Sequence, residues 1–332
     1  MRPPLSIAFG SGRAGVGKST LVANLAVALQ RQGYRCLLWD ANISAPTLHT
    51  LFGVDPLLRA ADAYFGRVQP EEVPLELRPG LWLFAERATS SPEAEQLLAR
   101  HFQKLLQRIA QRLRPDVVLL DLPAGWSELV YLGCSTAAMN CLVLGDDIGS
   151  VLDAYGFLKA LSAQPEALTV QLIVTNVVDS SDAAEIAQKL NTVAARFLGR
   201  RFPLLGEVPY DPAHQAALLQ QRPLVEHLPT APAAQAYQRL AMALIQALQR
   251  THAPRASQTA WQHHRFRAQC RRTCRLRCTD YLFCTARACA GGSTGARVSR
   301  LRGQCAGDNL RYRSPADASP CPPELWHRGP CW

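Results

Sequence analysis

Residues 5 to about 250 alternate between short apolar runs and longer segments in which apolar residues return every three or four positions. Each run has the length of a buried strand. The predicted strands are residues 5–11, 35–41, 81–87, 116–124, 139–146 and 168–177. The predicted helices are residues 19–33, 93–113, 149–162, 182–199 and 232–250. This alternation predicts an α/β fold with a single doubly wound, mostly parallel sheet and helices on both faces. In such sheets ligands bind beyond the carboxyl ends of the strands.

The periodic pattern stops after Thr251. We therefore divide the chain into a domain of residues 1–252 and an Arg- and Cys-rich tail of residues 253–332, which we interpret as disordered or derived from a frameshift. Two alternatives for the tail are an arginine-rich arm for nucleic acid or membrane and a metal site. The cysteines considered for a metal site are Cys270, Cys274, Cys278, Cys284 and Cys289. Their spacing lacks the C-x2-C pairs usual in zinc and iron–sulfur sites.

Charge is distributed unevenly along the chain. The tail holds 14 Arg, no Lys and 4 acidic residues, so it accounts for the whole net charge of +10. Residues 1–252 keep 22 basic and 22 acidic residues, and this balance argues against nucleic-acid binding by the domain. The sequence shows neither an 18-residue apolar run nor a signal-peptide pattern, so we expect a cytoplasmic protein.

The segment Gly12-x4-Gly17-Lys18-Ser19 matches the phosphate-binding loop pattern in full, between a predicted strand and a predicted helix. Glycines allow backbone N–H groups to surround an anion, and the helix adds the positive end of its dipole. In this pattern Lys18 reaches the β- and γ-phosphates, and the Ser19 hydroxyl binds Mg²⁺. A second acidic position, Asp121, follows four apolar residues and would hold Mg²⁺ through water.

These motifs resemble those of the MinD/ParA family of ATPases with a deviant phosphate loop, over about residues 5 to 250. The loop "SGRAGVGKST" (11–20) resembles the family's phosphate loop, and "WDANISAPTLHTLFGV" (39–54) resembles its switch I. "DLPAG" (121–125) matches switch II, and "GSVLDAYGFLKAL" (149–161) resembles a helix of the flagellar-number MinD-like group. "IVTNVV" (173–178) and residues 206–241 match the strand and closing segment that contact the base.

The resemblance implies ATP and Mg²⁺ as ligands and a homodimer that forms when ATP binds. It implies ATP-binding roles for Gly12, Arg13, Ala14, Gly15, Val16, Gly17, Lys18, Ser19, Thr20, Asn176, Pro209, Tyr210 and Asp211. It implies metal-binding roles for Ser19, Asp40 and Asp121, and catalytic roles for Lys18, Asp40, Asn42 and Arg13.

Three positions in two motifs, the phosphate loop and switch I, depart from the family pattern. Arg13 replaces the signature lysine that crosses to the partner's phosphates, and Ala14 replaces the glycine after it. Asn42 replaces the second carboxylate of switch I, which helps to position or activate the attacking water. An amide cannot accept a proton, and losing a general base costs a rate factor of roughly 10²–10⁴. We therefore expect an ATPase that binds ATP well and hydrolyses it slowly; the alternative is that these changes are tolerated in a working enzyme.

The resemblance favours a switch that sets flagellum number or placement, with a flagellar or cell-pole partner protein. The alternatives are a partition or division-site ATPase and a nucleotide-binding module without turnover. Residues 236–255 could form an amphipathic helix that contacts the inner face of the membrane. Its apolar stripe is Leu240, Ala243, Leu244, Ala247 and Leu248. Such a stripe equally fits a helix packed on its own domain.

Overall fold

The computed structural model describes residues 4–165 and 168–252. Its centre is an eight-stranded sheet with the order β3-β4-β2-β5-β1-β6-β7-β8. The strands are β1 (Leu5–Ser11), β2 (Cys36–Asp40), β3 (Leu75–Arg78), β4 (Leu81–Phe84), β5 (Val117–Ala124), β6 (Met139–Gly145), β7 (Val170–Val177) and β8 (Leu204–Pro209). All neighbours are parallel except β3, which runs antiparallel to β4 at one edge.

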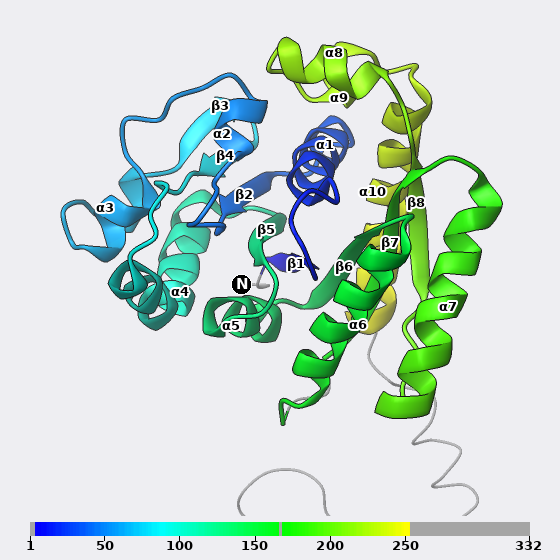
Figure 1. The fold of residues 1–332 in the computed structure, drawn as a ribbon. Helices are drawn as coiled ribbons and strands as arrows, with labels where there is room; N and C mark the ends of the chain where they lie inside the picture. The colour runs from blue at the N-terminus through cyan, green and yellow to red at the C-terminus, as the bar shows by residue number, and fades with distance from the viewer. Residues whose placement is uncertain (1–3, 166–167, 253–332) are drawn as a thin grey trace, which may run out of the picture. The chain divides into compact units, whose positions relative to one another are not determined.

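Helices cover both faces of this sheet (Figure 1). The α-helices are α1 (Lys18–Arg31), α2 (Leu48–Leu51), α3 (Ala60–Tyr64), α4 (Pro92–Leu113), α5 (Glu128–Thr136), α6 (Ile148–Ser162), α7 (Ser180–Leu198), α8 (Ala213–Leu219), α9 (Leu224–His227) and α10 (Pro232–His252). A 3₁₀ turn, η1 (Pro70–Glu72), precedes β3. The predicted fold class is confirmed: a mostly parallel sheet lies between two helical layers.

Each face of the sheet has its own hydrophobic core. On one face α1 and α10 pack on the strands. On the other face α4, α5, α6 and α7 do so, and Trp39 of β2 stacks on Phe102 of α4 with ring centroids 4.4 Å apart. Alternate strand residues point to opposite faces, so strands buried on both sides must be apolar throughout.

The apolar stripe of α10 belongs to the first of these cores. Leu240, Leu244 and Leu248 are buried there, and Ala247 packs against the same cluster. This finding favours the interpretation of a helix packed on its domain, because a buried stripe cannot face a membrane. Residues 253–255 of the candidate segment lie outside the described residues. No helix in the described part of the chain is long and apolar enough to cross a membrane.

Strand register brings the chemically important ends together. Asp40, the last residue of β2, is paired in register with Asp121 of β5, and β1 lies on the other side of β5. The loop that follows β1 therefore begins beside both carboxylates. This edge is the one at which parallel α/β sheets bind ligands.

Candidate nucleotide site

The predicted phosphate loop spans the gap between the end of β1 and the start of α1. Gly15 has φ 84° and Gly17, the N-cap of α1, has φ 80°, both in the left-handed region that favours glycine. Gly17 therefore turns the chain directly into α1, whose first residues are Lys18 and Ser19. The free N–H groups of this helix end form the positive pole that an anion requires.

Neighbouring elements hold the loop in place. A Cβ on Gly12 would lie 2.2 Å from the carbonyl carbon of Asp153, so the loop backbone rests directly on the backbone of α6. Further along, the Thr175 hydroxyl of β7 donates a hydrogen bond of 2.6 Å to the carbonyl of buried Val16. The loop is thus built before any ligand arrives, which reduces the entropy lost on binding.

Lys18 and Asp121 form a buried ion pair through Lys18 Nζ and Asp121 Oδ1. The second oxygen, Asp121 Oδ2, is buried without a hydrogen-bond partner, as is the nearby hydroxyl of Ser11 at the end of β1. An unsatisfied buried carboxylate oxygen is costly, and such atoms mark positions where a missing group belongs. With the Ser19 hydroxyl on the adjacent turn, this donor set fits Mg²⁺, which prefers oxygen ligands and retains water.

Asp40 organises the loop that follows β2. Its Oδ2 accepts hydrogen bonds of 2.9 Å from the N–H groups of Thr47 and Leu48, and its Oδ1 accepts one of 3.3 Å from the N–H of Asn42. Burial and the charge of Asp121 raise the pKa of Asp40, while these N–H donors oppose the rise. Backbone groups already use most of its acceptor positions, so any metal contact would use the remaining lone pair.

The Asn42 side chain is occupied within its own loop. Its Nδ2 donates to the carbonyl of Ala45 at 2.9 Å, and its Oδ1 accepts from the Ser44 hydroxyl at 3.1 Å. An aspartate at this position could accept from Ser44 but would face the Ala45 carbonyl with a second acceptor. The amide therefore stabilises this loop conformation. The sequence analysis considered Asn42 only as the replacement of a carboxylate and did not predict this role.

Arg13 extends from the loop to α6. Its Nη2 forms an ion pair with Asp147 Oδ2, and the two side chains are 41% and 47% exposed. Asp147 is also the N-cap of α6, where its Oδ1 accepts from the N–H of Ser150 at 3.0 Å. The Ser150 N–H and the Arg13 guanidinium hold the pKa of this carboxyl below its usual range.

A cavity opens beside the phosphate loop. It has a volume of about 310 Å³ and is lined by Gly15, Gly17, Thr20, Thr175, Asn176, Val208, Tyr210, Asp211, Pro212, His214, Gln215, Leu218 and Tyr237. The structure thus brings the predicted Asn176, Tyr210 and Asp211 together with the loop. The predicted Pro209 does not line this cavity.

The walls of this cavity also include His214 and Tyr237, which sequence reasoning missed. His214 of α8 bonds through Nε2 to the Tyr237 hydroxyl of α10 at 2.8 Å, and burial lowers the pKa of this histidine. Asp211 accepts from the N–H groups of Ala213 and Ala233 at 2.9 and 3.1 Å, so its carboxylate joins α8 to α10. Contacts between residues about 20 positions apart carry no periodic signal, so only the fold reveals them.

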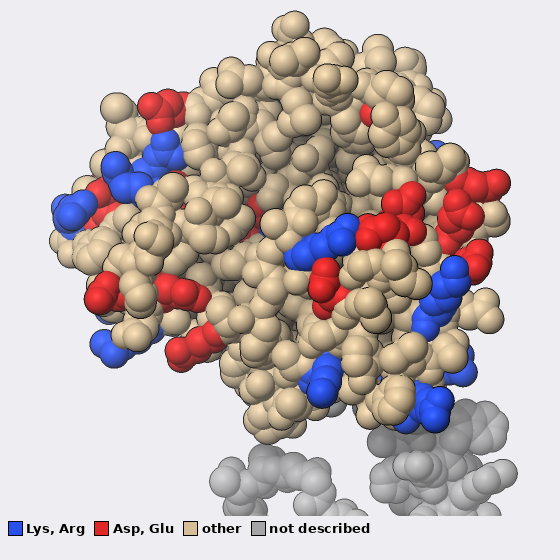
Figure 2. Space-filling view, in the orientation of Figure 1, with Lys and Arg blue, Asp and Glu red and all other residues tan. Residues whose placement is uncertain are grey.

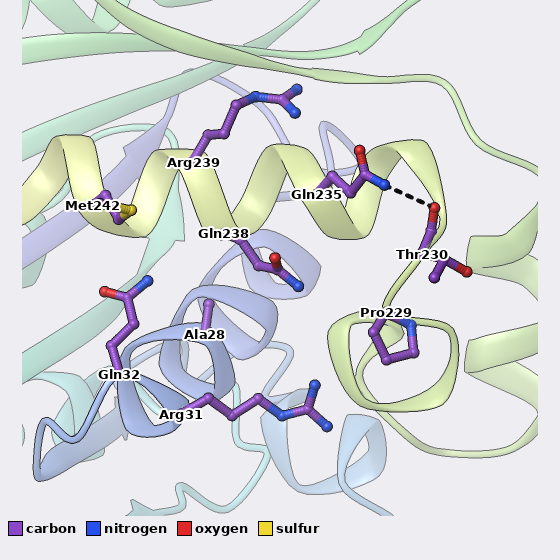
Figure 3. Close-up of a pocket in the computed structure, with 9 residues that line it drawn as sticks. All are labelled: Ala28, Arg31, Gln32, Pro229, Thr230, Gln235, Gln238, Arg239 and Met242. Atoms are coloured by element: carbon purple, nitrogen blue, oxygen red, sulfur yellow. Dashed lines mark hydrogen bonds between the residues drawn. The ribbon is translucent and has the colours of Figure 1, made fainter.

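A cavity larger than this one lies elsewhere, between α1 and α10 (Figure 3). Its volume is about 610 Å³, and its lining residues are Ala28, Arg31, Gln32, Pro229, Thr230, Gln235, Gln238, Arg239 and Met242. None of these is a predicted site residue, and Arg31 is already engaged with the carbonyl of Val225 at 2.7 Å. Size alone therefore does not locate the site, whereas the phosphate loop and the paired carboxylates do.

Basic and acidic side chains are interspersed on the face drawn in Figure 2. This face shows no continuous basic area over the described residues, in keeping with the charge balance of residues 1–252. The fold, the glycine-shaped loop and the Lys18–Asp121 pair define a phosphate-loop nucleotide-binding protein. The family model for the CobQ/CobB/MinD/ParA nucleotide binding domain matches residues 7–224. The chain belongs to this family, as its motifs predicted.

Relatives with known or assigned roles fall in several branches of the family. The antiactivator FleN of Pseudomonas aeruginosa is 30% identical over 245 residues, which cover 73% of this chain and 86% of FleN. The flagellum site-determining protein YlxH of Helicobacter pylori is 27% identical over 57% of this chain and 63% of its own length. The structure of MinD from Pyrococcus horikoshii, complexed with Mg-ADP, aligns with a TM-score of 0.61 and 23% identity, over 73% of this chain and 96% of that one.

Proposed function

We propose that this protein is an ATP-dependent dimerisation switch that binds ATP with Mg²⁺ and hydrolyses it slowly. The observation that carries this proposal is a complete phosphate site beside a switch I whose Asn42 amide is bonded into its own loop. Family membership and the MinD structure with Mg-ADP support nucleotide and Mg²⁺ binding.

Each residue of the site has a task in this proposal. Lys18, which pairs with Asp121, would bind the β- and γ-phosphates, and Ser19 with Asp121, the latter through water, would hold Mg²⁺. Arg13 supplies positive charge to the partner subunit's phosphates, as arginine fingers do in related reactions. Asp40 keeps the loop after β2 in place, and the cavity with Asn176 and Tyr210 receives the base.

The first test concerns hydrolysis. Asn42→Asp supplies the carboxylate that a general base requires, so we expect its ATP turnover to rise by roughly 10²-fold or more. Asn42→Ala is the matched control, because it removes the amide without adding a base and leaves turnover low. Steady-state phosphate release by the full chain measures both. A wild-type rate equal to that of Asn42→Asp would contradict slow hydrolysis.

The process that the switch serves is proposed from the relatives and from one helix. YlxH, one of the relatives, is named for determining the flagellum site, and FleN is named an antiactivator. Residues 149–161 resemble a helix of the flagellar-number MinD-like group. We infer a role in flagellum number or placement through a flagellar or cell-pole partner protein. Expression of this chain in Pseudomonas aeruginosa lacking FleN tests this role, because restored flagellar number supports it and unchanged number opposes it.

Two other functions compete with this proposal. A partition ATPase would show salt-dependent DNA binding by the ATP dimer, because phosphate contacts release counterions. A binding module without turnover would hold ATP but neither dimerise nor hydrolyse it. Light scattering with ATP and then with ADP separates this last case from the switch, which doubles its mass with ATP only.

A further inference from the structure

Arg13, the residue at the position of the family's signature lysine, already has a partner within its own subunit. Its guanidinium lies at the start of α6, where Asp147 Oδ2 accepts from Nη2. Among the described residues this is the carboxylate that pairs with Arg13. An arginine side chain held here cannot at the same time donate both of its terminal nitrogens across a subunit interface.

Three features of α6 shape this contact. Asp147 is fixed as the N-cap by its bond to the Ser150 N–H, so its carboxylate has a defined direction. Gly149 leaves room for the guanidinium, because a Cβ there would lie 2.9 Å from Arg13 Nη1 and 3.0 Å from Asp147 Oδ1. Gly12, the residue before Arg13, lies against the backbone of the same helix, so the chain at Arg13 is held close to α6.

We propose that Asp147 is a positioning residue that holds Arg13 within its own subunit and so weakens ATP-dependent dimerisation until the partner's phosphates displace it. This inference rests on the proposed dimer switch and adds one step to it: Arg13 must leave Asp147 before the dimer can form. A triphosphate carries more negative charge than a carboxylate, so bound ATP competes for Arg13 where ADP, lacking the γ-phosphate, competes less well. The pair is half exposed, which keeps it weak enough to open.

The size of the effect follows from the exposure of the pair. One pair must open in each subunit, so a dimer loses two. Exposed pairs of this kind predict a dimer dissociation constant about two- to thirty-fold lower when both are removed. Because the contact is ionic and exposed, the difference must shrink as the salt concentration is raised.

Asp147→Asn is the direct variant. Asparagine is an equally good N-cap, so α6 keeps its first turn while the charge that holds Arg13 is removed. Gly149→Ala is a second variant, because its added methyl group crowds both Arg13 Nη1 and Asp147 Oδ1 and so disturbs their contact while it leaves all charges in place. Asp146→Asn is the matched control: Asp146 is exposed, carries the same charge, and shows no ion pair to Arg13 in the described structure.

Sedimentation velocity of the full chain with a non-hydrolysable ATP analogue and Mg²⁺ measures the dimer. The expected result is tighter dimerisation by Asp147→Asn and Gly149→Ala, with Asp146→Asn like the wild type and the differences smaller in high salt. A dimer whose affinity Asp147→Asn leaves unchanged or weakens overturns this inference alone. Monomers in every variant, with nucleotide bound, overturn the dimer switch itself and this inference with it.

Discussion

Glu86 is a buried carboxylic acid that lies just beyond β4 and outside the nucleotide site. Its Oε1 accepts hydrogen bonds from the N–H groups of Arg87 and Ala61 at 2.9 and 3.1 Å and from the Tyr64 hydroxyl at 3.3 Å. Its Oε2 is buried without a partner. Burial raises the pKa of Glu86 from 4.5 to about 7, against the lowering by these donors. The folded protein therefore holds a proton here that the unfolded chain releases.

This residue predicts how stability depends on pH. Between pH 4.5 and about 7 the folded state binds more protons than the unfolded state, so the free energy of unfolding falls as the pH rises and then levels off. Glu86→Gln removes this fall and should stabilise the protein above pH 7 by about 1–3 kcal/mol. Urea unfolding at pH 5 and pH 8 measures the free energy of unfolding of both proteins. Exposed Glu76→Gln is the control; equal pH slopes for Glu86→Gln and the wild type would contradict the assignment.

At the scale of elements, the sequence predicted those with strong periodicity. The six apolar runs and five amphipathic segments correspond to β1, β2, β4, β5, β6 and β7 and to α1, α4, α6, α7 and α10. The edge strands β3 and β8 were missed because they are short and only partly buried, so neither shows a continuous apolar run. The short helices α2, α3, α8 and α9 were also missed, because each spans fewer than two turns and is too short to show a helical period.

The residues of the site could likewise be predicted only in part. Gly12 to Ser19 and Asp121 could be predicted because their chemistry is encoded in local spacing and strand ends. The Arg13–Asp147 pair could not, because its members are 134 residues apart and meet only through the packing of α6 on the loop. Likewise, His214 of α8 and Tyr237 of α10 are 23 positions apart and meet only in the folded chain.

Two glycine substitutions, one where the phosphate loop contacts α6 and one on α6 itself, should have opposite effects on stability. Gly12→Ala places a methyl group against the α6 backbone, so we expect the free energy of unfolding to fall by about 1–3 kcal/mol. Because the phosphate loop must shift to make room, ATP binding should weaken as well. Gly156→Ala, on α6 itself, meets nothing within 4 Å and should stabilise the helix by about 0.5–1 kcal/mol. Thermal unfolding and titration with a fluorescent ATP analogue measure both. Wild-type affinity in Gly12→Ala would show that the contact is dispensable.

At the scale of the whole molecule, the described fold and the net charge belong to different parts of the chain. Both cores and the predicted nucleotide site lie within residues 4–252. Residues 1–252 hold 22 basic and 22 acidic residues, so their charges balance. The net charge of +10 belongs to residues 253–332. Fold and nucleotide binding should therefore be properties of one segment, and attraction to polyanions a property of the other.

Truncation after His252 tests this separation. Since the truncated chain keeps both cores and the site, we expect its ATP affinity to equal that of the full chain. The full chain should also bind DNA weakly without sequence preference, with an affinity that falls steeply as salt rises, because its 14 tail arginines attract phosphates. The truncated chain should lose this binding. Isothermal titration with ATP and fluorescence anisotropy with DNA measure the two properties. Salt-dependent DNA binding that persists in the truncated chain only with ATP would contradict the separation and favour a partition ATPase.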